Sequence, residues 1–335
     1  MAQSEESIKD IVHHDKVDTL YWVTSKGVYR INTQNDTDGI CRIFSMIETG
    51  LQPTGLALDR ATDNLYLSGV DEYNSKSVIK VISTEALNKS VDLVTSHQTV
   101  ITDVVIENGR GLLFWSERLT PRTGRIICST MDGSLMKWKL KNIVHPVALA
   151  LDPIQGRVYW ADFILHSISS CDYNGQKQKL EVKYTKGQPL SITFFESQIT
   201  WTNVATDKEK GKGISTIYRQ KLSTDNCIIQ HAVIQNTISQ ILTVHPVLEP
   251  ELVNPCASAS CDNGLCLLRD NVTAICMCYP QNNEKVMPSS SRVSQADNLI
   301  LQNEADHMTS SDAYCVVTLS TCILVYYLII LATVG

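Results

Sequence analysis

The sequence lacks several features that would point to common classes of protein. Its first ten residues, Met1 to Asp10, are polar and contain no apolar segment of the kind that a secretory signal peptide needs. It has no Lys/Arg patch interleaved with aromatic residues, and its formal net charge is -6, so nucleic acid is not expected as a partner. Neither a Gly-x-Ser-x-Gly nucleophile motif nor a His/Glu zinc pair is present. We therefore expect no catalytic residue, cofactor or metal.

What the sequence does contain is a short pattern that recurs five times: an aromatic pair or its remnant, followed by a small polar residue. The copies are Tyr21-Trp22-Val23-Thr24, Tyr66-Leu67-Ser68-Gly69, Phe114-Trp115-Ser116-Glu117, Tyr159-Trp160-Ala161-Asp162 and Thr200-Trp201-Thr202-Asn203. Their first residues lie 45, 48, 45 and 41 positions apart. A period in this range indicates a propeller or a solenoid.

The surroundings of each copy favour the propeller. An apolar run such as Pro146 to Asp152 precedes the aromatic pair and is typical of a buried strand. A half-exposed strand follows, and then a turn such as Asp172 to Gly175, in which glycine accepts a positive φ. With a closing strand, each unit has about four strands, as a propeller blade requires. We predict five blades, near residues 8-50, 51-99, 100-143, 144-187 and 188-236.

This pattern resembles the YWTD, or class B, repeat of the low-density lipoprotein receptor family. The fullest copy is the fourth, in which Tyr159 to Asp162 follows Leu149-Ala150-Leu151-Asp152, and only Asp162 keeps the final acid of the motif. The resemblance implies an all-β, six-bladed YWTD-type propeller over 8-248. Five blades are recognisable, and Ile241 to Val244 resembles the strand that closes the ring.

In this family an EGF-like module follows the propeller, and residues 254-280 resemble a truncated one. The resemblance implies disulfides between Cys256 and Cys266 and between Cys261 and Cys276, which leaves Cys278 as an odd thiol. Residues 253-255, Val-Asn-Pro, replace the acidic residues that precede calcium-binding modules of this type, so we expect no calcium here.

Ring closure is a second departure from the family pattern. The first blade already begins near Ile8, so residues 1-7 are too few for the three strands that complete a sixth blade. One interpretation is that the sequence lacks its original N-terminus. The alternative is a five-bladed ring with one supernumerary strand.

The eleven cysteines, five of them closely spaced, predict an oxidising compartment. The pairing of Cys41, Cys128, Cys171 and Cys227 is left open. Three glycosylation sequons begin at Asn35, Asn88 and Asn271, all in predicted loops.

The C-terminal part predicts attachment to a membrane. Residues 313-335 contain no charge and would span about 34 Å as a helix, which is enough for a bilayer core of about 30 Å. They are predicted to be either a hydrophobic spanning helix or a GPI attachment signal. Residues 281-312 are rich in Ser, Asn and Gln and are predicted to be a flexible stalk. Either anchor would place the propeller at the cell membrane, facing outward.

The resemblance implies a non-enzymatic cell-surface protein that binds extracellular protein or lipoprotein ligands, in endocytic uptake or as a Wnt-type coreceptor. Tyr73 and Trp138 are candidate contact residues, although Trp138 could instead pack between blades. One alternative is a propeller hydrolase with a calcium-dependent tunnel site. Against it, Asp59 and Asp152 follow the inner strands, where aspartates commonly bind local backbone amides. A truncated matrix or decoy fragment is a further alternative.

Overall fold

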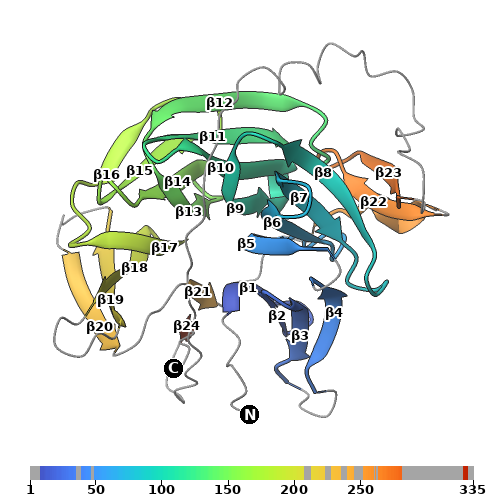
Figure 1. Cartoon of the computed structure of the whole chain (residues 1–335), viewed down its shortest axis with the longest axis horizontal. Coiled ribbons are helices and arrows are strands. Elements are labelled where there is room, and N and C mark those ends of the chain that lie inside the picture. Colours follow the sequence, from blue (N-terminus) through green and yellow to red (C-terminus); the bar gives the residue numbers. More distant parts are fainter. Residues whose placement is uncertain are drawn as a thin grey trace.

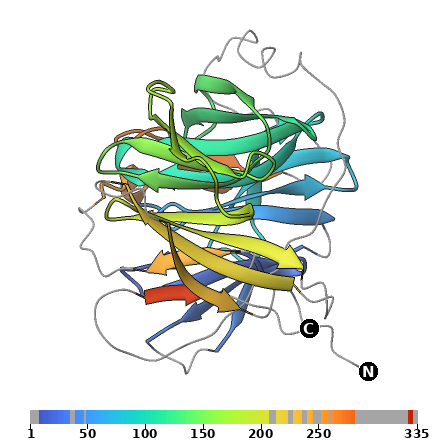
Figure 2. The same cartoon turned by 90° about the vertical axis from the view of Figure 1, so that its left-hand side faces the viewer.

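In the computed structural model, most of the described residues lie in β-strands. The described residues are 8-34, 39-46, 49-206, 213-222, 228-234, 240-244, 252-259, 261, 263-280 and 327-330. Within them the only helical segments are two short 3₁₀ turns, η2 (Asn108–Arg110) and η3 (Pro255–Ser258). Figure 1 shows the sheets arranged as an arc around a central axis, and Figure 2 shows the same sheets from the side.

Five four-stranded antiparallel sheets form the blades, and the strands of each blade follow one another in sequence order. Blade one contains β1 (Ile8–His14), β2 (Thr19–Thr24), β3 (Gly27–Asn32) and β4 (Cys41–Ser45). Blade two contains β5 (Leu51–Leu58), β6 (Leu65–Asp71), β7 (Lys76–Ile82) and β8 (Ser90–Ser96). Blade three contains β9 (Val100–Glu107), β10 (Leu112–Thr120), β11 (Thr123–Thr130) and β12 (Met136–Ile143).

Blade four contains β13 (Pro146–Asp152), β14 (Arg157–Asp162), β15 (Ser167–Asp172) and β16 (Lys179–Val182). Blade five contains β17 (Gln188–Phe195), β18 (Gln198–Thr206), β19 (Gly213–Lys221) and β20 (Ile228–Ile234). The all-β propeller and its five blades, predicted from the repeat, are confirmed.

The repeat is visible in the core because its aromatic residues lie between adjacent sheets. Tyr66, Phe114, Tyr159 and Trp201 are all at most 1% exposed. The turns agree with the prediction as well, since Gly133 and Gly175 have φ values of 69° and 74°, where side chains other than glycine are strained. The spacing of the repeat therefore corresponds to one blade for each aromatic pair.

A single strand continues the ring after blade five. β21 (Ile241–Val244) lies between blade five and blade one (Figure 1), and Ile241 packs in one apolar cluster with Ile11 of β1 and Ile217 of β19. β21 thus occupies the place of the first strand of a sixth blade. Its sheet partner is β24 (Tyr327–Ile330), which runs antiparallel to it.

This pairing corrects one prediction about the C-terminus. The sequence predicted a hydrophobic helix over 313-335, but residues 327-330 form strand β24, because their backbone groups pair with the open edge of β21. The other residues of 313-335, like the predicted stalk at 281-312, lie outside the described residues. Among the residues that the structure describes, no helix is both long and apolar enough to cross a membrane.

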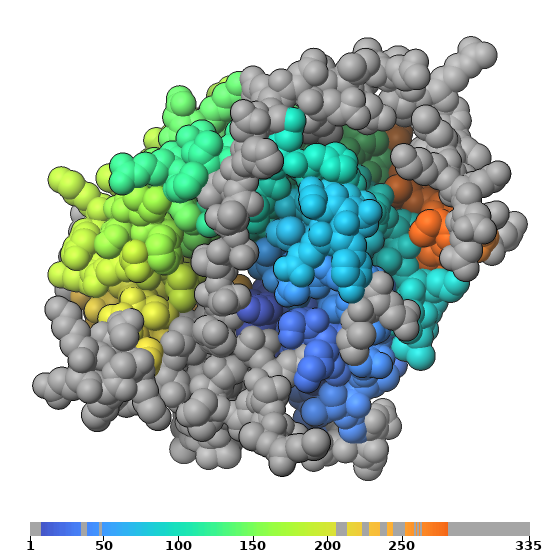
Figure 3. Space-filling model, in the orientation of Figure 1, coloured from blue at the N-terminus to red at the C-terminus, as the bar shows by residue number. Residues whose placement is uncertain are grey.

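Residues 254-280 form a small module built on the hairpin of β22 (Gly264–Leu268) and β23 (Ala274–Cys278). Disulfides join Cys256 to Cys266 and Cys261 to Cys276. Cys278 is an exposed free thiol at the end of β23. In Figure 3 the orange surface of this module lies against the blue and cyan surface of blade two.

Candidate functional site

The antiparallel blades place their connecting loops alternately on two faces of the ring. One face carries the loops between first and second strands and between third and fourth strands. The small module contacts loops of this face, at Asn64, Gly111 and Asp132. We call it the module face. The opposite face carries the loops between second and third strands and those that lead from one blade to the next.

Near the opposite face, the innermost strand of every blade contains a one-residue bulge. The bulge residues are Lys9, Thr54, Thr102, Val147 and Leu190. Two of them connect blades: Thr54 Oγ1 donates to Ile101 O (2.8 Å) and Thr102 Oγ1 donates to Pro146 O (2.9 Å). A bulge turns its side chain away from the regular alternation, which here directs the hydroxyl toward the next blade.

The residue after the bulge makes a second kind of tie between blades. Asp10 Oδ2 accepts from the Leu56 amide (2.6 Å), and Asp103 Oδ2 accepts from the Leu149 amide (2.7 Å). At the same position in blade five, Ser191 Oγ accepts from the amide of Ile241 in β21 (3.1 Å). These contacts hold successive inner strands together, so that the ring is a rigid platform.

The two aspartates are fully engaged by the backbone. Their Oδ1 atoms accept from the next amides of their own strands, Ile11 N (2.7 Å) for Asp10 and Val104 N (2.8 Å) for Asp103. Burial raises the pKa of Asp10 to about 7 despite its two amide donors. Burial, and then the charge of Asp10, holds the pKa of Asp103 well above its usual range. Because all four oxygens accept backbone amides, the pair is suited to tying blades rather than to binding a metal.

The raised pKa of Asp10 predicts a pH-dependent stability. The Asp10 carboxyl ionises near pH 3.8 in the unfolded chain and near 7 in the folded one. Its contribution to the free energy of unfolding is therefore complete below pH 3.8 and is lost as the pH rises through 7. In Asp10→Ser, the hydroxyl can accept the Leu56 amide as Ser191 accepts that of Ile241. In guanidinium unfolding, the difference in free energy of unfolding between wild type and variant should change by about 1.4 kcal/mol for each pH unit between 7 and 3.8. The change favours the wild type as the pH falls. A constant difference between pH 5.5 and 7.5 would contradict this.

The module is fixed to blades two and three mainly by apolar contact. Leu265, Leu267 and Leu268 of β22 are at most 6% exposed, and they belong to one cluster with Tyr66 of blade two and Met131 of blade three. Burying a leucine side chain contributes roughly 1.5–3 kcal/mol. The module is therefore part of the propeller core rather than a tethered appendage.

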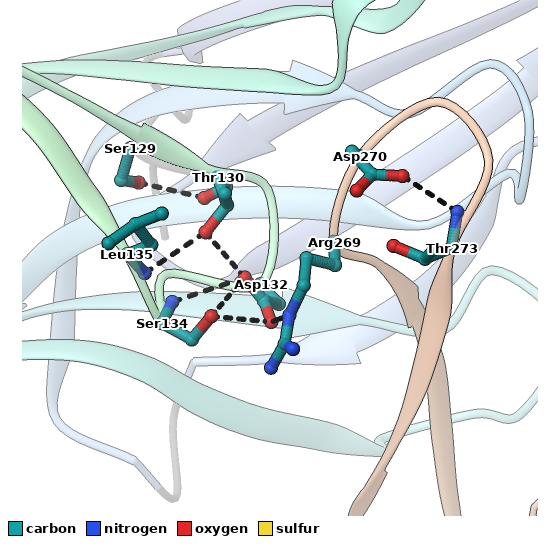
Figure 4. Close-up of polar contacts among 8 residues, drawn as sticks. All are labelled: Ser129, Thr130, Asp132, Ser134, Leu135, Arg269, Asp270 and Thr273. Carbon is teal, nitrogen blue, oxygen red and sulfur yellow. Dashed lines mark hydrogen bonds and ion pairs between the residues drawn. The ribbon is translucent and has the colours of Figure 1, made fainter. Parts of the chain in front are cut away.

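Polar contacts fix the orientation of the module (Figure 4). Asp132, in the turn between β11 and β12, accepts from Thr130 Oγ1 (2.6 Å) and Ser134 N (3.1 Å) through Oδ1, and from Arg269 Nε (2.8 Å) through Oδ2. The Asp132 side chain is completely buried, while that of Arg269 is 44% exposed. Asn64 Nδ2 also donates to Cys266 O (2.9 Å). The sequence carried no signal for this contact, because it joins segments more than 100 residues apart.

The opposite face carries exposed aromatic and basic side chains. Tyr73 is 72% exposed, and Tyr184, 56% exposed, stacks on His166 with ring centroids 6.1 Å apart. Arg122 and Lys183 are exposed on loops of the same face. Trp138, by contrast, packs between blades, with its ring near Phe114 and its indole N–H donating to Tyr173 O (2.8 Å). Of the two aromatic candidates from the sequence, the structure thus leaves Tyr73 available for contact.

A histidine on this face is partly buried beside a cation. His145 Nε2 lies 2.9 Å from Arg118 Nη1, and its Nδ1 lies 3.1 Å from Pro121 O. Burial lowers the pKa of His145, and the Arg118 charge adds to that effect. The imidazole therefore stays neutral further into the acid range than a free histidine.

The remaining residues singled out from the sequence are dispersed. Asn88 and Asn271 are exposed in turns, and Asn88 Oδ1 accepts from Ser45 N (2.9 Å). Cys128 and Cys171 are buried free thiols whose pKa burial raises to about 12, and Cys41 is a half-buried free thiol. Asn35 and Cys227 lie outside the described residues.

The acidic residues at the strand ends bind local backbone. Asp59 Oδ1 accepts from Ala61 N (3.0 Å), and Asp152 Oδ1 accepts from Ile154 N and Gln155 N (both 3.0 Å). Asp162, which keeps the acid of the repeat, accepts amides from both Val144 and Leu165 and so closes two turns. Within the described part of the chain, no group of three or more His, Cys, Asp or Glu side chains is arranged to hold a metal ion.

Curated relatives of this chain are receptors. It is 27% identical over 254 residues (72% of the chain) to the vitellogenin receptor Yl of Drosophila melanogaster, and 21% identical over 268 residues (77%) to the vitellogenin receptor of Solenopsis invicta. It is 26% identical over 184 residues (52%) to low-density lipoprotein receptor-related protein 5 of Homo sapiens. The aligned parts make up only 12%, 14% and 10% of those proteins. No family model matches the chain.

The similarity of this chain to solved structures supports the fold alone. A chain of a nidogen/laminin complex superposes with a TM-score of 0.52 at 16% identity, covering 67% of this chain and 80% of that one. A gluconolactonase from Xanthomonas campestris superposes with a TM-score of 0.53 at 12% identity, covering 71% and 79%. The five blades and their aromatic repeat define a β-propeller of the YWTD class. Together with the receptor relatives, they are consistent with a YWTD propeller of the low-density lipoprotein receptor family.

Proposed function

We propose that this chain is a non-enzymatic, outward-facing binding region of a cell-surface receptor, which takes an extracellular protein or lipoprotein ligand on the opposite face of the ring. The observation that carries the proposal is the asymmetry between the two faces. The module covers part of the module face at blades two and three, while the opposite face exposes Tyr73, Tyr184 and Arg122. Tyrosine and arginine are enriched in protein interfaces.

The ring offers a pre-formed surface for such a ligand. Ties from Asp10, Asp103 and Ser191 connect inner strands of neighbouring blades, so little of the backbone has to be ordered on binding. Two of the relatives are named for vitellogenin, which makes a yolk lipoprotein the first ligand to test; a Wnt-type coreceptor role, implied by the family resemblance, is the alternative.

The proposal includes an anchor and sugar chains. Its support for membrane attachment through residues 313-335, as a spanning segment or a GPI signal, is their lack of charge; attachment would require residues 327-330 to leave the pairing with β21. Its support for N-glycans is the exposure of Asn88 and Asn271, together with the sequon at Asn35. A fall in mass of the secreted protein on enzymatic deglycosylation, made smaller in Asn88→Gln and in Asn271→Gln, tests the glycans.

Binding of purified vitellogenin to the immobilised, secreted chain tests the function. We expect Tyr73→Ser and Tyr184→Ser to weaken binding by at least about tenfold each, as truncation of an interface anchor commonly does. The control is Leu135→Ser, which changes a side chain that is 56% exposed on the module face. Binding that falls only with the control variant would show that the wrong face was chosen. Absence of binding would refute the yolk-lipoprotein ligand.

A further inference from the structure

The junction between blades four and five contains a cleft of about 260 Å³ that opens on the module face. Its lining comes from β14, β16 and the β13–β14 loop of blade four, and from β17 and two loops of blade five. The lining residues are Gln155, Arg157, Tyr159, Lys179, Glu181, Phe194, Ser197 and Leu222. Charged, amide, hydroxyl and aromatic side chains thus meet in one small space.

The fold does not require polar residues at this place, as the preceding junction shows. Between blades three and four, Phe114 packs against Trp138 and Tyr173, with ring centroids 5.9 and 5.1 Å away. By strand register, Phe114 corresponds to Tyr159 and Trp138 corresponds to Lys179. Replacing an apolar filling by buried charges commonly costs stability, which points to a role other than packing.

The charged groups of the cleft form a network around Glu181, whose side chain is 2% exposed. Glu181 Oε1 accepts from Ser170 Oγ (2.6 Å), and that hydroxyl also accepts from Arg157 Nη2 (2.6 Å). Glu181 Oε2 lies 2.7 Å from Lys179 Nζ, but within the described residues it accepts no well-directed hydrogen bond. Lys179 is 60% exposed, so it can move aside for a ligand.

An aromatic pair forms the apolar wall of the cleft. The rings of Tyr159 and Phe194 stack with centroids 4.8 Å apart and an angle of 13° between their planes. Tyr159 is 1% exposed and belongs to the core, whereas Phe194 is half-buried. Phe194 therefore offers a flat, partly open surface beside the charged network.

The mixture of donors and acceptors restricts the chemistry of a ligand. A carboxylate would pair with Arg157 and Lys179 but leave Glu181 without a donor, and an ammonium group would pair with Glu181 but leave the two cations without an acceptor. A hydroxyl group satisfies both requirements, because it accepts hydrogen bonds from the cations and donates one to the carboxylate. The volume, below the range of about 300–1,000 Å³ for drug-sized ligands, suits a single ring.

We propose that the cleft between blades four and five binds a neutral sugar ring, with its hydroxyls on Glu181, Lys179 and Arg157 and its C–H face on Phe194. The site is separate from the proposed ligand face. It would let the receptor region recognise a hexose, either free or at the end of a glycan. Absence of sugar binding in this cleft would leave the proposed receptor function unaffected.

Saturation-transfer NMR of the full chain with glucose, galactose, mannose and N-acetylglucosamine, one at a time up to 50 mM, tests the proposal. We expect at least one sugar to receive saturation through its ring protons, with displacement by a glycan that ends in that sugar if a glycan is the natural ligand. Lys179→Ala and Phe194→Leu are expected to weaken binding at least about tenfold. Glu181→Gln should do the same, but Lys179→Ala changes an exposed side chain and keeps the test independent of folding.

The matched control is Ile154→Ala. Ile154 is 91% exposed in the loop that carries Gln155, but its side chain does not line the cleft. The control should bind like the wild type. Absence of saturation transfer for every neutral sugar would overturn the proposal, and so would binding that Lys179→Ala and Phe194→Leu leave unchanged. Binding of acidic sugars alone would also overturn it, since Arg157 and Lys179 would then be the binding groups and Glu181 would have no donor.

Discussion

Arg125→Ala is expected to lower the free energy of unfolding of the propeller by about 3–5 kcal/mol, since it leaves a buried carboxylate without its cation. Arg125 of β11 binds Glu117 of β10 through Nε (2.6 Å) and Nη2 (2.5 Å), and both side chains are at most 7% exposed. Trp115 Nε1 donates to the other oxygen of Glu117 (2.8 Å). Glu117 holds the fourth position of the repeat in blade three, so the loss would spread through that blade.

The midpoint of guanidinium unfolding, followed by tryptophan fluorescence, measures this effect. Arg122→Ala is the matched control, because Arg122 lies in the same hairpin but is exposed, and its loss should change stability by less than about 0.5 kcal/mol. Removing both partners in Glu117→Gln/Arg125→Ala should restore part of the stability, since no buried charge then remains. Equal stabilities for Arg122→Ala and Arg125→Ala would show that the pair is not buried in solution.

The blades could be predicted from the sequence because each one repeats the same local physics. An apolar inner strand, an aromatic pair and a glycine turn recur at one period, so each copy supports the assignment of the others. Even degenerate copies keep the buried position, as Trp201 in blade five shows. The register of every inner strand includes the same bulge. No residue pattern predicted it, because the bulge residue varies from Lys9 in blade one to Leu190 in blade five.

The surfaces between segments could not be predicted in the same way. In the sequence, Asp132 is an ordinary turn residue and Arg269 an ordinary loop residue. Only the docked module brings Arg269 Nε to 2.8 Å from Asp132 Oδ2. The cleft has the same origin, because Glu181 and Phe194 belong to different blades. For the C-terminal segment, hydropathy alone predicted a helix. In the structure, residues 327-330 instead pair as a strand with the open edge of β21.

Leu267→Ser is expected to release the small module from the propeller. Leu267 is completely buried, and it shares one cluster with Tyr66 and Met131 of the propeller. Removing most of a buried leucine side chain costs about 2–5 kcal/mol through lost burial and the cavity that remains, and a buried hydroxyl without a partner adds to this cost. The two disulfides keep the module closed on itself, so the loss falls on the interface.

Hydrogen exchange separates this outcome from general unfolding. In Leu267→Ser, amides of β22 and β23 and the module-face loops of blades two and three should lose protection by at least about tenfold, while those of blade five keep theirs. Val272→Ser, which changes a side chain 65% exposed in the turn between β22 and β23, should leave protection as in the wild type. Unchanged protection in Leu267→Ser would mean that Leu267 is not needed and that the remaining apolar and polar contacts hold the module. Loss throughout the ring would mean instead that the module supports the whole propeller, as its place in the core of blades two and three allows.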